Sequence, residues 1–188
     1  MTLQVIRTSL PEVLLVQPAV FKDERGFFME SYNQAAFAQA TGVTARFVQD
    51  NHSSSGHGVL RGLHYQSRQP QGKLVRVPQG RIFSVAVDLR RSSPRLGRWV
   101  GTELDAAGAR QLWVPAGFAH GFLVLSDSAD VMYKTTEYRA EGFECAIAWN
   151  DPELGIDWPL HELKSAPRLS ARDAQAPGWG QAQLFENM

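Results

Sequence analysis

Cysteine is almost absent from this sequence of 188 residues, in which Cys145 is the only one. One thiol excludes both an internal disulfide framework and a cysteine-rich zinc site, and it favours a reducing compartment. A long apolar run is missing too. The N-terminal stretch has no cationic leader, and its apolar segment Val13–Val16 is too short to span a bilayer. We therefore expect a soluble cytoplasmic protein without a membrane partner.

The sequence also lacks an excess of either charge, because nineteen Lys and Arg balance nineteen Asp and Glu. Without a global positive field the chain is not drawn onto nucleic acid, so an anionic ligand has to be met by local cations. A chain of this length with 44% hydrophobic residues can bury one substantial core. We expect one domain over residues 1–188, with a loose C-terminal segment, 159–188, that wraps over it.

Helical patterns are scarce. Asn33–Ala40 is the clear one, with Asn33 as its cap and Thr41-Gly42 as its end, and a short tail helix after Ser170 is a further candidate. Short apolar or alternating runs separated by turn residues predict strands instead, most clearly over Arg81–Leu89. The predicted strands are Gln4–Arg7, Val13–Val16, Gly26–Ser31, Phe47–Asn51, Val59–Gln66, Lys73–Val77, Arg81–Leu89, Arg98–Leu104, Gln111–Val114, Gly121–Leu125, Asp130–Glu137 and Cys145–Asn150.

This pattern of about a dozen short strands without a repeat predicts an all-β fold, a double-stranded β-helix or jelly roll with a few short helices. Such a closed arrangement limits the number of exposed strand edges. An immunoglobulin-like sandwich is the alternative, since it has similarly short strands joined by turns.

The stretch Leu60–Val77, LRGLHYQSRQPQGKLVRV, concentrates groups that could perform chemistry. His64 supplies a general base, while Arg61 and Lys73 supply cations. These are the groups needed to remove a proton beside a carbonyl and to hold the resulting oxyanion. Strand alternation puts Arg61 out of phase with His64, so both share a face only if the strand kinks at Gly62, which glycine permits. The alternative is that the two cations are solvated and His64 is a satisfied core residue.

A second stretch, Trp113–Leu125, resembles the second half of the cupin signature, because a Pro-x-Gly-x-x-His run makes a turn and places His120 at the start of a strand. Metal-binding cupins also carry His-x-His and a later Glu in the first half. Here the matching residues read His64-Tyr65-Gln66. Two histidines alone make a poor metal site, so we expect no metal and an organic substrate in the barrel mouth.

A later strand and the early strands offer further polar groups. Tyr133 shares a face with its neighbours at alternate positions, so its hydroxyl could project inward as an acid, although a barrel Tyr bonded to a backbone carbonyl explains it equally well. Gln49 and Asn51 place two amides either side of an acid, which suits recognition of a polar ligand.

Several motifs together are similar to the family of dTDP-4-dehydrorhamnose 3,5-epimerases. The segments that carry the resemblance are FKDERGFFMESYN, FVQDNHSSS, VLRGLHYQ, QGKLVRV, LGRWVG, QLWVPAGFAHGFLVLS, MYKTTEY, AWNDPELGIDWP and LSARDA. The resemblance implies a homodimeric cupin-type jelly roll of nucleotide-sugar biosynthesis. It also implies dTDP-4-dehydro-6-deoxyglucose as substrate, inversion at the two carbons that flank its 4-keto group, and no cofactor.

The resemblance further implies a role for each matching residue. His64 would be the base and Asp173 its partner, Tyr133 the acid on the opposite side of the sugar, and Lys73 the support of the enolate oxygen. The substrate-binding residues would be Arg25, Glu30, Gln49, Asn51, Arg61, His120, Tyr138, Arg139, Glu144 and Arg172.

Two of these positions depart from the family. Arg172 stands where Lys is common, which keeps the charge but alters its geometry. Arg139 stands where the family has an aromatic side chain that stacks on thymine; a guanidinium can also stack on a base, and Tyr138 could substitute if the loop shifts.

Three alternatives for the function stay open. A relative that inverts only one carbon, or that acts on a neighbouring nucleotide sugar, would use the same base and acid. A metal-dependent cupin oxygenase or isomerase would use His64 and His120 as ligands. A non-catalytic module that binds sugar nucleotides would need neither a base nor an acid.

Overall fold

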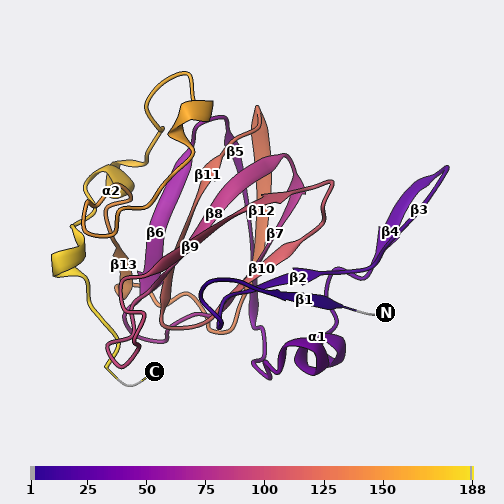
Figure 1. Cartoon of the computed structure of the whole chain (residues 1–188), viewed down its shortest axis with the longest axis horizontal. Coiled ribbons are helices and arrows are strands. Elements are labelled where there is room, and N and C mark those ends of the chain that lie inside the picture. The colour runs from indigo at the N-terminus through magenta and orange to yellow at the C-terminus, as the bar shows by residue number, and fades with distance from the viewer. Residues whose placement is uncertain (1–2, 187) are drawn as a thin grey trace.

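The structure is a computed structural model that describes residues 3–186 and 188, and nearly all of its regular structure is β (Figure 1). The strands are β1 (Gln4–Arg7), β2 (Leu14–Gln17), β3 (Val20–Asp23), β4 (Gly26–Met29), β5 (Gln49–Gly56), β6 (Leu60–Gln66), β7 (Lys73–Gln79), β8 (Arg81–Asp88), β9 (Trp99–Asp105), β10 (Gln111–Val114), β11 (Phe118–Val124), β12 (Ser128–Thr135) and β13 (Glu144–Ala146). The helices are α1 (Gln34–Thr41) and α2 (Ala171–Ala174), with short 3₁₀ turns at Leu160–Glu162 and Trp179–Gln181.

Two antiparallel sheets face each other. One has the strand order β1-β2-β10-β7-β12-β5, and the other has the order β13-β6-β11-β8-β9. Their inner faces form one hydrophobic core, to which Val75 and Val131 contribute from the first sheet and Ile82 and Phe122 from the second. The predicted double-sheet jelly roll is therefore confirmed, since neighbours in both sheets come from distant parts of the chain.

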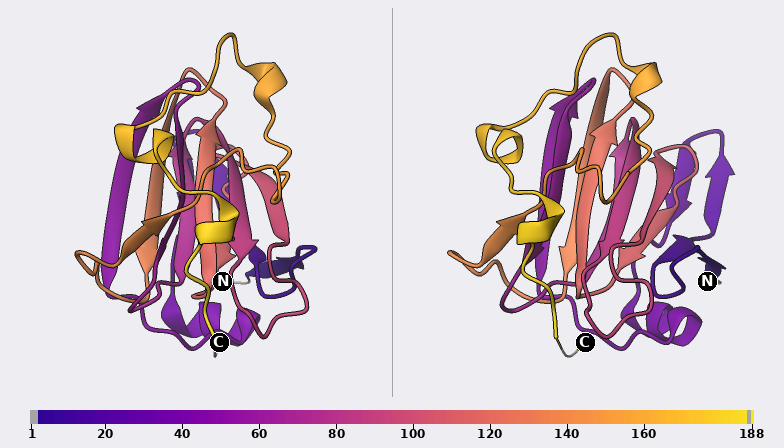
Figure 2. Two further views of the ribbon diagram at one scale, coloured as in Figure 1. Left: turned by 90° about the vertical axis from the view of Figure 1, so that its left-hand side faces the viewer. Right: turned by 60° about the vertical axis from the view of Figure 1, so that its left-hand side comes forward.

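The strand β8 is buried on both faces, which explains its almost continuous apolar sequence. Ile82 and Ala86 point into the core between the sheets, whereas Val85 and Val87 belong to a second cluster outside the five-stranded sheet. The C-terminal segment closes that second cluster with Phe185, and Figure 2 shows the segment running along this face of the sheet. Residues 159–186 thus lie over the sheet that carries β6.

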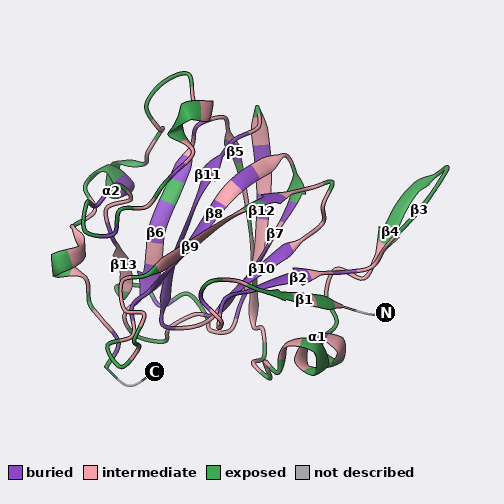
Figure 3. Cartoon of the chain, viewed as in Figure 1, coloured by how far each residue is buried: buried purple, intermediate pink, exposed green. Residues whose placement is uncertain are grey.

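The hairpin β3–β4 extends away from both sheets (Figure 1) and is exposed along almost its whole length (Figure 3). Its side chains include three large exposed aromatics, Phe21, Phe27 and Phe28, which are 54–65% exposed. Sequence patterns predict β4 but not β3, because Val20–Asp23 neither alternates in polarity nor becomes buried.

Helix α1 begins and ends as predicted. The Asn33 side chain accepts a hydrogen bond from the Ala36 N–H, and Gly42 adopts a left-handed conformation that closes the helix. Helix α2 is the tail helix expected after Ser170, which caps it.

Most strands differ from their predicted ranges by one to three residues at an end, and β5 and β13 differ most. Strand β5 runs on to Gly56 because its polar residues pair with β12. Strand β13 spans Glu144–Ala146 where the sequence predicts Cys145–Asn150, because it pairs with β6 over those three residues only. No helix among the residues described is long and apolar enough to cross a membrane.

Candidate active site

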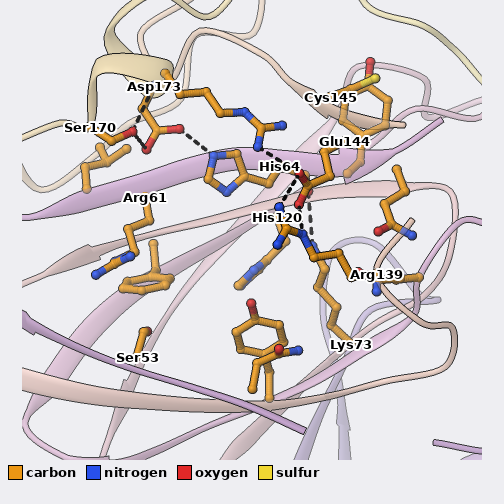
Figure 4. A pocket seen from close by; sticks show the side chains of 18 of the residues that line it. Ser53, Arg61, His64, Lys73, His120, Arg139, Glu144, Cys145, Ser170 and Asp173 are labelled. Carbon is orange, nitrogen blue, oxygen red and sulfur yellow. Dashed lines mark hydrogen bonds and ion pairs between the residues drawn. The ribbon is translucent and has the colours of Figure 1, made fainter. Parts of the chain in front are cut away.

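A cavity of about 470 Å³ opens between the two sheets, and the loop before α2 and α2 itself form part of its rim. Strands β5, β7 and β12 line it from one sheet and β6, β11 and β13 from the other. Figure 4 shows the side chains that converge there. Eleven of the fourteen predicted site residues line this cavity, namely Gln49, Asn51, Arg61, His64, Lys73, His120, Tyr133, Arg139, Glu144, Arg172 and Asp173.

The kink expected at Gly62 is present and brings Arg61 and His64 into the same cavity. His64 pairs with His120 and Arg61 with Phe122, so β6 carries one more residue than β11 across this stretch. Such a bulge turns the out-of-phase residue towards the same side. Only glycine fits at its centre, because a Cβ on Gly62 would lie 2.5 Å from the Gly121 Cα and φ is +127°.

His64 and Asp173 form the closest polar pair of the site. The Nε2 of His64 lies 2.5 Å from Oδ1 of Asp173, whose side chain is only 3% exposed. Burial raises the pKa of Asp173, but hydrogen bonds from His64 and Ser170 outweigh it and hold the pKa below its usual value. Ser170 donates to the second carboxylate oxygen at 2.9 Å, so both oxygens of Asp173 are fixed. The pair leaves Nδ1 of His64 as the nitrogen able to accept a proton.

Lys73 is a buried cation without a carboxylate partner among the residues that the structure describes. It stands at the start of β7, and its Nζ donates to the His64 carbonyl at 3.2 Å. Burial lowers the pKa of Lys73 to about 8. A poorly solvated ammonium of this kind interacts strongly with any negative charge that develops beside it.

Tyr133 enters the cavity from β12, in the sheet opposite the one that carries His64. Burial raises the pKa of Tyr133, although the charge of Arg61 acts against this. The hydroxyl therefore keeps its proton at neutral pH. An imidazole and a protonated phenol thus line the same cavity from two different sheets.

His120 lines the cavity from β11, next to His64 in the paired strands. Burial, together with the nearby charges of Lys73 and His64, lowers the pKa of His120 well below its usual value. The ring is therefore neutral. Its Nε2 lies 3.0 Å from the hydroxyl of Ser84 on β8, a residue with no exposed surface.

One group of charges at the cavity rim is internally paired. Glu144 accepts two hydrogen bonds from Arg139, at 2.9 and 3.1 Å, and a third from Arg172 at 3.4 Å. The hydrogen bond from Arg139 holds the pKa of Glu144 below its usual value, although burial acts against this. Two donor groups of the Arg139 guanidinium are thereby occupied.

A second pair of arginines has no carboxylate partner among the described residues. Arg61 donates to the Ser55 hydroxyl at 3.0 Å. Arg168 pairs its backbone with Leu60 and lines the same cavity. Its guanidinium reaches Gly56, the residue after Ser55, because a Cβ built there would lie 3.7 Å from Nη1. Both guanidiniums therefore lie against the end of β5 and can receive an anion.

Three predicted substrate-binding residues lie outside the cavity lining of this chain, namely Arg25, Glu30 and Tyr138. Arg25 sits in the turn of the β3–β4 hairpin, where it pairs with Asp23 and its side chain is 83% exposed. Glu30 follows the hairpin and bonds to Asn33. Tyr138 is 63% exposed at the surface.

Sequence reasoning missed some lining residues, including Ser53, Gln71, Arg168 and Ser170. Ser53 alternates with Asn51 along β5, so extending that predicted strand would have found it. Arg168 carried no such signal, because it lies in an irregular segment. No group of three or more His, Cys, Asp or Glu positioned to hold a metal occurs in the described part of the chain.

Comparison with known proteins identifies the family of this chain. A family model described as dTDP-4-dehydrorhamnose 3,5-epimerase matches residues 7–181. The enzyme of that name from Pseudomonas aeruginosa is 58% identical over 179 residues, which cover 95% of this chain and 97% of that protein. The one from Salmonella typhimurium is 54% identical over 183 residues, covering 97% and 98%.

Solved structures agree as well. The crystal structure of a dTDP-6-deoxy-D-glucose-3,5-epimerase from Legionella pneumophila in complex with dTDP-4-keto-L-rhamnose superposes with a TM-score of 0.94 at 46% identity and covers 99% of both chains. A 3'-monoepimerase from Streptomyces bikiniensis has a TM-score of 0.87 at 32% identity and covers 96% of this chain and 92% of its own. This chain therefore belongs to the dTDP-4-dehydrorhamnose 3,5-epimerase family, whose members are cupin-like jelly-roll isomerases.

Proposed function

We propose that this protein inverts both carbons that flank the 4-keto group of dTDP-4-dehydro-6-deoxyglucose and yields dTDP-4-dehydro-L-rhamnose. The observation that carries the proposal is the meeting of the His64–Asp173 pair, Tyr133 and Lys73 in one cavity, with the base and the phenol on opposite sheets. A base and an acid on opposite sides of a ring are what inversion through an enolate requires. The free thiol of Cys145 supports a cytoplasmic location.

His64 takes the proton from the carbon beside the ketone. Its Nε2 is engaged by Asp173, which leaves Nδ1 as the acceptor and stabilises the imidazolium that forms. Asp173 is itself fixed by Ser170, so the ring is held in one orientation. The same residue can act at both carbons, because each is adjacent to the same carbonyl group.

Lys73 stabilises the charge that moves onto the sugar's O4 as the C–H bond breaks. The loss of one such donor typically costs about 2.7–4 kcal/mol of transition-state stabilisation. Tyr133 then returns a proton to the other side of the ring. Its raised pKa supports this role, because the phenol stays protonated at neutral pH.

The remaining rim residues bind the nucleotide. Arg61 and Arg168 lack a competing carboxylate in the described chain and can take the diphosphate, which suits two forked guanidiniums. Arg139 has two donor groups committed to Glu144, so it offers the face of its guanidinium to a ring rather than its edge to a phosphate.

The hairpin β3–β4 supports a homodimer. Phe21 and Phe28 are paired across the two strands and form an exposed apolar patch on one face of the hairpin, of the kind that marks an interaction site, while Phe27 is exposed on the other face. Arg25 and Glu30 accompany these side chains but lie outside this chain's own cavity. Seated on a second copy of the chain, the hairpin would deliver both residues to the partner, where they would contribute to substrate binding.

Mixed dimers test this arrangement. One variant carries His64→Ala and the other carries Arg25→Ala with Glu30→Ala, so that each homodimer is impaired. If the hairpin acts across the dimer, mixing the two should restore active sites that combine one intact cavity with one intact hairpin. A mixture with no more activity than its two parents contradicts the exchange.

The test of the reaction is turnover in heavy water followed by mass analysis of the sugar. Inversion at both carbons predicts two deuterons in the product, one at each position. A single deuteron would instead support inversion at one carbon, the alternative represented by the Streptomyces bikiniensis 3'-monoepimerase, which shares this fold. Product without ring deuterium contradicts proton transfer altogether.

A further inference from the structure

Ser84 lies behind the cavity and does not line it, but its hydroxyl contacts the ring of His120, which does. No other described residue outside the lining makes such a hydroxyl contact with a lining ring. Ser84 stands on β8, has no exposed surface and lies 3.0 Å from Nε2 of His120. The contact joins residues 36 positions apart and is buried on both sides. Since the rest of β8's buried side chains near it are apolar, a hydroxyl at this place needs an explanation.

Counting donors and acceptors shows which of Ser84 and His120 donates the hydrogen bond. A serine hydroxyl has one proton, and within the described chain Nε2 of His120 is the one partner of Ser84. If His120 donated to Ser84, the serine proton would be buried without an acceptor. If Ser84 donates to Nε2, both groups are satisfied. The second arrangement requires the His120 tautomer that carries its proton on Nδ1.

The Nδ1 nitrogen of His120 is not sealed inside the protein. In the described chain Nδ1 makes no hydrogen bond. It is also not one of the fully buried side-chain atoms that lack a hydrogen-bond partner, so it keeps some exposed surface. His120 lines the cavity, and both Lys73 and His64 lie close enough for their charges to act on its ring. An N–H on Nδ1 therefore opens into the region where the proposed function puts the sugar ketone.

We propose that Ser84 is a positioning residue that fixes His120 as an Nδ1–H donor to the sugar's C4 oxygen, beside the Lys73 ammonium. This inference rests on the proposed function for the identity of the oxygen, but the tautomer itself does not depend on it. A neutral imidazole that donates is a suitable partner for an enolate, because it stabilises charge without adding a competing proton source of low pKa.

The tautomer can be measured directly in the whole protein. The chain has five histidines, so two-bond proton–nitrogen spectra of ¹⁵N-histidine protein are simple, and the signals lost in His120→Gln assign this ring. We expect the wild type to show a protonated Nδ1 and an unprotonated Nε2. Ser84→Ala should move the ring towards the Nε2-protonated form. A wild-type ring protonated on Nε2 overturns the proposal, whatever the enzyme does.

Kinetics then separate positioning from stability. Ser84→Ala should lower kcat by about tenfold or more with little change in KM, because a wrong tautomer removes an interaction made in the transition state. Ser84→Cys keeps a weak hydrogen-bond donor, so its kcat should lie between those of the wild type and Ser84→Ala. In a His120→Ala background, Ser84→Ala should cause no further loss, whereas an equal further loss contradicts the coupling.

Ser126 provides the matched control. Its hydroxyl bonds the backbone of Arg81 and Ser128 at the far end of the same strand pair. Ser126→Ala should lower thermal stability but leave both kcat and the His120 tautomer unchanged. If Ser84→Ala fails to fold, the wild-type spectrum still decides the proposal. If His64→Ala keeps full turnover, the proposed reaction mechanism fails while the tautomer result stands.

Discussion

The Nε2 of His64 on β6 lies 2.5 Å from Oδ1 of Asp173 in α2, although 109 residues separate them in the chain. The imidazole thus belongs to the five-stranded sheet, and the carboxylate that contacts it belongs to the C-terminal segment that covers the outside of that sheet. This contact links the covering segment to the proposed reaction site, so changes that displace Asp173 or α2 should affect turnover as well as stability.

Replacement of His64 by Asn should abolish proton abstraction but keep the nucleotide sugar bound. We expect kcat to fall by about 10²–10⁴-fold, since the general base is lost, while the Kd for dTDP changes little. Steady-state kinetics and calorimetry measure the two quantities. His161→Asn is the control, because His161 is exposed outside the cavity. Near-normal turnover of His64→Asn would show that another group is the base.

Tyr133→Phe should separate proton removal from completed inversion. His64 can still form the enolate and return a deuteron to the face from which it took the proton, so recovered substrate should acquire deuterium in heavy water. Product formation should fall by about 10²–10⁴-fold, because the opposite face has lost its acid. Mass spectrometry of substrate and product measures both. Recovered substrate without deuterium would contradict the assignment.

The charge of Lys73 should set the alkaline limb of activity. Burial lowers its pKa to about 8, so the ammonium is present below that pH and is lost above it. We expect kcat/KM to decline above about pH 8. Lys73→Met should lower kcat by about 10²–10³-fold and remove this limb, since one oxyanion donor is lost. An unchanged alkaline limb in the variant would assign it to another group.

The same substitution should stabilise the fold. Below about pH 8 the folded protein holds Lys73 as a buried ammonium, which water would solvate better in the unfolded chain. In the unfolded chain the pKa of Lys73 returns to its usual value of 10.5. Between these values the unfolded chain binds more protons, so wild-type stability rises with pH. The Tm advantage of Lys73→Met should therefore be largest below pH 8 and shrink as the pH rises towards 10.5. Calorimetric scans across this range measure it.

Gly62→Ala should damage both fold and site. Its Cβ would meet Gly121 at 2.5 Å, in a left-handed backbone region, with an expected cost of about 1–3 kcal/mol. Because the bulge aligns Arg61 with His64, turnover should fall further than stability alone explains. Gly180→Ala is the matched control, since nothing lies within 4 Å of an added Cβ there. Equal, small effects of the two changes would contradict this account.

Arg168→Gln should weaken nucleotide binding without altering the chemistry. We expect the Kd for dTDP to rise by about tenfold, from the loss of one charge-assisted hydrogen bond, and its salt dependence to become weaker. Arg91→Gln is the control, because Arg91 pairs with Glu186 outside the cavity. A loss of kcat at unchanged Kd would place Arg168 in the chemical step instead of the phosphate site.

Local sequence predicts much of this fold because a buried face repeats apolar residues at regular spacing along the chain. Strand β8 alternates between two buried faces, and helix α1 is capped by Asn33 and closed by Gly42, so the strand and both ends of the helix could be found without a structure. The need for a kink at Gly62 also follows from alternation alone. Exposed strands such as β3 leave no such period, and sequence patterns therefore miss it.

By itself, then, the sequence determined most of the strands, the helix caps and a set of chemical groups, since each depends on neighbours a few residues away. The tertiary structure decided which of those groups meet. The Asp173 contact with His64, the Ser84 contact with His120 and the approach of Arg168 to the end of β5 all join segments distant in the chain. The packing of two sheets and a covering segment sets these contacts, and no local pattern encodes that packing.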